Sequence, residues 1–132
     1  MALATRGDLA SIDAIQGIKA PYLSALTAGE ALDALAPCYI AADGMVYMSN
    51  GTNADAAAKC LGFAPKAYAA GAAVTIYGPG TRAEYGSGLT PGAPLYVAAT
   101  AGRLDTAATT GGTVPVAAAI NDREIVVVAL TA

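Results

Sequence analysis

The stretch Pro37-Cys38-Tyr39-Ile40-Ala41-Ala42-Asp43-Gly44-Met45-Val46-Tyr47-Met48 is the clearest local signal in this sequence. Aromatic, β-branched and other apolar residues stand on both sides of Asp43-Gly44. An Asp-Gly pair between two such runs is a strong signal for a two-residue β-hairpin loop. Asn50-Gly51 follows as a turn. The segment therefore predicts two antiparallel strands joined at residues 43–44.

Further short strand-like runs extend outward from this hairpin, each bounded by Gly, Pro or Asn. They lie at residues 60–64, 73–77, 82–85, 95–99, 114–119 and 124–130. About eight short strands at this spacing favour an all-β barrel or sandwich. Residues 54–60 have helical propensity but are interrupted early, so they predict a turn or one helical turn entering a strand. For residues 29–35, helix and turn both stay open.

Part of the chain repeats itself. Residues 36–42 read Ala-Pro-Cys-Tyr-Ile-Ala-Ala, and residues 93–99 read Ala-Pro-Leu-Tyr-Val-Ala-Ala. Both follow the order small, Pro, apolar, Tyr, β-branched, Ala, Ala. We interpret the repeat as a strand-turn-strand unit that the two halves of a barrel share.

The N-terminal region has a different character. Ile12, Ile15 and Ile18 are spaced three apart and could mark a short helix, which Gly17 and Pro21 would confine. A core helix and an arm that becomes ordered on a partner or a neighbouring subunit are both consistent with this pattern.

Composition excludes several classes of function. Of 132 residues, 55% are hydrophobic and only 13% charged, with 7 basic and 10 acidic residues and no His. No basic stripe could neutralise phosphates, so we expect no nucleic-acid partner. The longest bulky apolar run, at 125–130, is far short of the about 20 residues of a membrane span, and residues 1–8 lack the pattern of a signal peptide, so we expect neither a membrane partner nor export by that route. Without His, the commonest general base and metal ligand are missing, so we expect no enzyme, cofactor or metal.

The two cysteines, Cys38 and Cys60, stand in apolar strand-like surroundings. In a reducing compartment buried free thiols are the expected state. The alternative is a redox pair, within or between subunits, that forms a cross-link after release into an oxidising medium. Neither cysteine has a His that could activate it as a nucleophile.

The composition favours a contact surface. About a quarter of the chain is Ala, and 15 residues are Gly. Small residues lose little side-chain entropy when they become ordered, and a weakly charged surface has few groups to desolvate. Tyr combines apolar area with a polar group, so tyrosines are candidate anchors, with core packing as their alternative role. The candidate contact residues are Ile12, Ile15, Ile18, Tyr22, Tyr39, Tyr85 and Tyr96.

Several of these segments together resemble a known family. They are residues 28–32 (Ala-Gly-Glu-Ala-Leu), the hairpin at 37–47, residues 85–97, residues 111–117 and the run 125–130. The series is similar to the small capsid decoration, or cement, proteins of tailed bacteriophages. Its most specific part is Leu-Thr-Pro-Gly-Ala-Pro-Leu-Tyr at 89–96. Residues 1–27 match less clearly, and Leu35-Ala36 stand where the family would have a Gly-Asp-like turn.

The resemblance implies a small β-barrel or β-tulip-like domain at 28–132 with an N-terminal arm at 1–27. It implies a structural virion protein, made in the host cytoplasm, that binds the outer surface of the expanded capsid as a homotrimer. There it would clamp neighbouring subunits of the major capsid protein and stabilise the shell against the pressure of internal DNA. It implies no catalytic residues. The alternative is another virion module, associated with a tail or fibre, that contacts the host surface.

Overall fold

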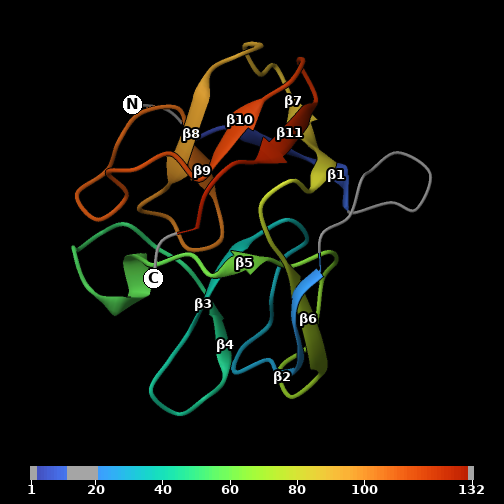
Figure 1. Cartoon of the computed structure of the whole chain (residues 1–132), viewed down its shortest axis with the longest axis vertical. Coiled ribbons are helices and arrows are strands. Elements are labelled where there is room, and N and C mark those ends of the chain that lie inside the picture. The colour runs from blue at the N-terminus through green and yellow to red at the C-terminus, as the bar shows by residue number, and fades with distance from the viewer. Residues whose placement is uncertain (1–2, 12–20, 131–132) are drawn as a thin grey trace.

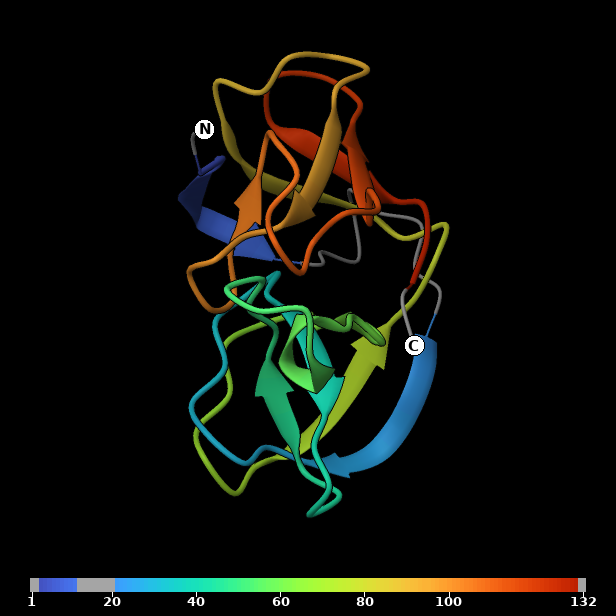
Figure 2. The same cartoon turned by 90° about the vertical axis from the view of Figure 1, so that its left-hand side faces the viewer.

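The computed structural model describes residues 3–11 and 21–130, which form two antiparallel β-sheets stacked along the long axis of the molecule (Figures 1 and 2). The six-stranded sheet has the order β1 (Thr5–Ser11), β7 (Arg82–Ser87), β11 (Glu124–Val127), β10 (Ala117–Ala119), β8 (Pro94–Val97) and β9 (Leu104–Asp105). The five-stranded sheet has the order β2 (Pro21–Thr27), β6 (Ala73–Tyr77), β5 (Gly62–Phe63), β3 (Pro37–Ile40) and β4 (Val46–Met48). The all-β prediction is confirmed.

Each sheet curls until its two edges meet. In the six-stranded sheet, Leu3 ahead of β1 bridges Asp105 of β9, and the Ala4 N–H donates to the Leu104 carbonyl at 2.9 Å. In the five-stranded sheet, the N–H of Gly29, just after β2, donates to the carbonyl of Val46 on β4 at 2.9 Å. Strand β1 therefore pairs with β7, and β2 pairs with β6. The chain at one end of β1 and of β2 also contacts the opposite edge of the same sheet.

The curled sheets enclose two neighbouring cores. Alternation places Tyr85 of β7 and Ile125 of β11 inside the six-stranded sheet, where both are fully buried. Phe63 of β5 belongs to the same cluster, so the larger core reaches into the five-stranded sheet. The smaller core contains Val46 and Ile76. Because apolar side chains connect the two sheets, they form one packed unit.

The hairpin predicted around Asp43-Gly44 forms, but its loop is longer than predicted. The Gly44 N–H donates to the Ala41 carbonyl at 2.9 Å, and the Ala41 N–H donates to the Met45 carbonyl at 3.0 Å. Gly44 has a φ of 83°, whereas Asp43 keeps a negative φ. A two-residue type I′ loop needs positive φ at both positions. The turn is therefore a type I turn closed by a glycine bulge.

The internal repeat corresponds to two outer hairpins. The first copy supplies β3, which pairs with β4, and the second supplies β8, which pairs with β9. Each pair stands at the end of its sheet. The predicted single helical turn within 54–60 is a 3-10 turn, η1 (Ala56–Ala58), capped by the Asp55 carboxylate. Residues 29–35 contain no helical turn.

The segment 1–27, expected as an arm, contributes strands to both sheets. Strand β1 pairs with β7, and β2 pairs with β6 with two register shifts. Ile12, Ile15 and Ile18 lie outside the described residues. An N-terminal arm at 1–27 that becomes ordered on a partner or a neighbouring subunit stays a prediction.

Candidate functional site

The two cysteines are buried free thiols, as expected. The Cys38 thiol donates to the Ala36 carbonyl at 3.3 Å, and the Cys60 thiol donates to the Gly62 carbonyl at 3.6 Å. Burial is the main cause that raises the pKa of Cys60 to about 12. Burial, and then the nearby charge of an ionised Cys60, raise the pKa of Cys38 well above its usual range. Both groups are therefore neutral thiols in the folded chain at neutral pH, and their use as a redox pair stays a prediction.

The tyrosines predicted as anchors occupy different surroundings. Tyr85 is fully buried, and its hydroxyl accepts a hydrogen bond from the Leu104 N–H at 3.0 Å. It belongs to the core in this fold, which is the alternative role given for the tyrosines, and a contact role for Tyr85 stays a prediction. Tyr39 and Tyr96 are half-buried on β3 and β8. The side chain of Tyr22 lies outside the described part of the chain.

An ordered, exposed hairpin tip lies between β3 and β4. We call residues 42–45 the hairpin tip; all four are exposed, and Met45 keeps 40% of its surface in solvent. The Asp43 carboxylate accepts from the Met45 N–H at 2.9 Å and from the Tyr47 hydroxyl at 2.6 Å. These bonds, the tyrosine first, hold the pKa of Asp43 below its usual range. The tip therefore presents an apolar side chain beside a fixed negative charge.

The rings of Tyr39 and Tyr47 support this tip from behind. Their centroids are 6.0 Å apart, and the ring planes are tilted by 32°. Offset or tilted aromatic pairs at this separation stabilise a strand pair beyond the area that they bury. The same hydrogen bond to Asp43 raises the pKa of Tyr47. This aromatic pair on the two hairpin strands keeps the tip in a defined position.

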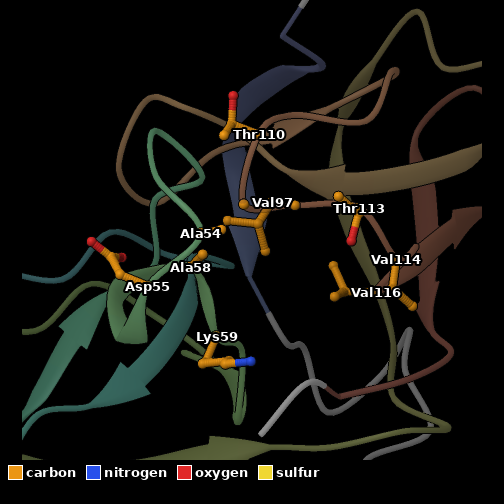
Figure 3. A pocket seen from close by; sticks show the side chains of 11 residues that line it. Ala54, Asp55, Ala58, Lys59, Val97, Thr110, Thr113, Val114 and Val116 are labelled. Atoms are coloured by element: carbon orange, nitrogen blue, oxygen red, sulfur yellow. The ribbon is translucent and has the colours of Figure 1, made fainter.

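A cavity of about 250 Å³, which we call the η1 cavity, lies between η1 and the loop at 110–116. Its apolar walls come from Ala54, Ala58, Val97, Val114 and Val116. Figure 3 shows η1 and Lys59 on one side, with Thr113, Val114 and Val116 on the other.

Two backbone features give the η1 cavity its shape. Added Cβ atoms at Gly111 and Gly112 would collide with neighbouring main chain, so the loop can approach this closely only with glycine. The Gly111 N–H donates to the Gly51 carbonyl at 3.0 Å, and the Gly112 N–H to the Thr109 hydroxyl at 2.9 Å. These bonds fix the loop against the rest of the chain. No motif in the sequence predicts this cavity; the Gly111-Gly112 pair is the signal available for it.

Two ion pairs lie elsewhere in the described part of the chain. Arg82 donates to Glu124 at 2.8 Å, and the same carboxylate accepts from Asn121 at 2.8 Å. Arg6 and Asp33 form a second ion pair at 2.8 Å. Within residues 3–11 and 21–130, no group of three His, Cys, Asp or Glu side chains is placed to hold a metal ion. No helix in this part has the length and apolar character needed to cross a membrane.

No protein-family model matches the sequence, and no curated protein is significantly similar to it. The fold and the surface define a small all-β protein with few charges, exposed apolar side chains and a preformed cavity.

Proposed function

We propose that this chain is a capsid decoration protein that binds the outside of an expanded bacteriophage head and clamps neighbouring subunits of the major capsid protein. The observation that carries the proposal is a set of exposed large apolar side chains on a chain with 13% charged residues. Leu3, Met45, Val114 and Val128 keep between 38% and 50% of their surface in solvent. Burying such groups against a partner is favourable at roughly 25 cal/mol per Å², and few charges must be desolvated.

The resemblance supports the finer parts of the proposal. It favours a homotrimer, a barrel or β-tulip-like domain of about eight short strands at 28–132, and an N-terminal arm at residues 1–27. Strands β1 and β2 each pair with a single named strand, and contact with the opposite edge is limited to one end, which supports an arm. The protein would be made in the host cytoplasm and located on the outer surface of the virion.

Stabilisation would follow from mass action. A protein that binds the expanded shell, but not the unexpanded shell or free subunits, shifts the equilibrium toward the expanded shell. At a free concentration of 100 times the dissociation constant, each occupied site adds about 2.7 kcal/mol. This amount, repeated over the lattice, opposes the outward pressure of packaged DNA without any catalytic step.

Cosedimentation with purified heads of the cognate phage tests the proposal. We expect the chain to pellet with expanded heads and to stay in the supernatant with unexpanded proheads. Val128→Asp puts a charge on an exposed apolar site and should weaken binding, whereas Ala99→Asp, at an exposed small residue, serves as the matched control. Equal binding to both particles, or to neither, would refute the proposal. Binding to host cells but to neither particle would favour the tail- or fibre-associated alternative.

A further inference from the structure

We infer that the η1 cavity receives the hairpin tip of a second copy of this chain, with Met45 inside the cavity and Asp43 against Lys59. The inference rests on the proposed function in one respect, because it assigns an interface to the proposed homotrimer. It starts from two features of the described residues: an exposed tip with an apolar and an acidic side chain, and a cavity with apolar walls and a lysine.

The cavity combines apolar walls with polar and charged side chains. Five of its eleven lining residues are Ala or Val, and Val114 is 50% exposed at its edge. Lys59 is the cation among the lining residues, and the two ion pairs found in the described part, Arg6–Asp33 and Arg82–Glu124, do not involve it. The acidic lining residue, Asp55, accepts a hydrogen bond from the Ala57 N–H at 3.1 Å as the cap of η1, which turns one of its oxygens toward the η1 backbone. A ligand with an aliphatic group and a carboxylate fits this arrangement.

The hairpin tip supplies both groups, two residues apart in the sequence. Met45 is unbranched and flexible, which suits it to fill an irregular cavity with apolar walls. The cavity volume of about 250 Å³ leaves room for a methionine side chain. Asp43 is two residues away, is held by its bonds to Met45 and Tyr47, and keeps lone pairs free for a lysine. Because the tip is ordered before binding, it loses little conformational entropy on docking.

The tip does not reach the cavity of its own chain. Strands β3 and β4 carry the tip to the lower end of the molecule, whereas η1 lies nearer to the six-stranded sheet in both views (Figures 1 and 2). The contact therefore joins two copies through different surfaces. Such a head-to-tail contact closes into a ring when the rotation between copies allows it, and a ring of three is the proposed homotrimer.

Sedimentation equilibrium on the intact chain tests the interface. Lys59→Glu and Asp43→Lys should each weaken self-association about tenfold, and the double variant should recover most of the loss because the charge pair is restored with opposite signs. Met45→Ala should weaken it about three- to eightfold, as expected for burying the 40% of this side chain that is now exposed. Lys66→Glu, at an exposed lysine outside the cavity, is the matched control and should associate like the wild type.

A zero-length carbodiimide cross-link gives a second measurement. In a mixture of ¹⁵N-labelled and unlabelled chains, we expect a bond between Lys59 and Asp43 that joins labelled to unlabelled peptide. A chain that stays monomeric at its highest soluble concentration would overturn the inference. So would Lys59→Glu and Met45→Ala variants that associate like the wild type.

The cosedimentation assay separates this inference from the proposed function. If the wild-type chain binds expanded heads but does not self-associate, this interface is refuted and the proposed function stands. If the chain self-associates through the η1 cavity but binds no heads, the interface stands and the proposed function is refuted.

Discussion

Replacing Tyr85 with phenylalanine removes one hydroxyl from the interior of the six-stranded sheet. That oxygen accepts a hydrogen bond from the Leu104 N–H at 3.0 Å, and both residues are fully buried. Phenylalanine keeps the ring and its packing, but the Leu104 N–H loses this partner. A buried donor without a partner costs about 1–3 kcal/mol. We expect Tyr85→Phe to lower the free energy of unfolding by about 2 kcal/mol.

Urea unfolding followed by far-UV circular dichroism measures this change, since the chain has no Trp to serve as a fluorescent reporter. The midpoint should fall at an unchanged slope, and for a chain of this size the melting temperature should fall by about 6–10 °C. The Leu104 amide should also exchange its proton faster, because the bond that protects it is gone.

The matched control is Tyr96→Phe. Tyr96 is half-buried, and its hydroxyl has no hydrogen bond to any part of residues 3–11 or 21–130, so its loss should change stability by less than about 0.5 kcal/mol. The reasoning is refuted if the two variants are equally stable, or if exchange at Leu104 is the same in Tyr85→Phe and the wild type.

Two further predictions concern the buried thiols and one glycine. The pKa values of Cys38 and Cys60 are raised in the folded chain. The stability that these neutral thiols contribute should therefore be complete below the ordinary thiol pKa of 9.0 and should be lost as the pH rises toward about 12. Replacing both cysteines with alanine should reduce this alkaline loss in urea titrations, and a thiol reagent should label the wild type only when it unfolds. Labelling of the folded chain at the unfolded rate would contradict this account of their burial. Gly86→Ala should cost about 3 kcal/mol by chemical unfolding, because its Cβ would collide with the Thr5 carbonyl on β1, whereas Gly7→Ala, which meets ordinary contacts from 3.5 Å, should cost little. Equal costs would show that β1 does not approach β7 this closely.

Local chemistry explains the parts of the fold that the sequence predicted well. Asp43-Gly44 marks a hairpin through the conformational freedom of Gly44 and the side-chain bonds of Asp43, which act within a few residues. The run at 73–77 is predicted as a strand, and it forms β6, in which buried residues alternate with more exposed ones. These signals depend on neighbours in sequence, so they can be read without knowing the tertiary structure.

The missed elements depend on partners that are distant in sequence. Strand β9 has only two residues, Leu104 and Asp105, and its strand pairing and bridge come from Tyr96, Val97 and Leu3. The burial of Tyr85 has the same origin, because β7 faces a space that other strands enclose. A tyrosine on an isolated strand is consistent with a core or a contact role, and the closure of the sheet decides between them.

The candidate site was even less accessible to prediction. The η1 cavity is formed by residues 54–59, 97 and 110–116, which approach one another only after both sheets have formed. Its lining is mostly small and lacks a sequence pattern of its own. The cysteines, by contrast, were predicted correctly as buried thiols because apolar neighbours on a strand are a local signal for burial.

The meeting of the sheet edges also constrains how the chain can be made. Leu3 bridges Asp105, and β1 pairs with β7, so these residues meet partners that are translated more than 70 positions later. Pairing between such distant segments is slow to form and leaves unpaired edges exposed in the meantime. The five-stranded sheet is built from residues 21–77 and can pair before β7 is made, whereas the six-stranded sheet cannot form completely before β11 is made. Refolding rate and yield should therefore depend strongly on the few residues at the N-terminus, and a fusion partner attached there is expected to slow closure more than one attached at the other end.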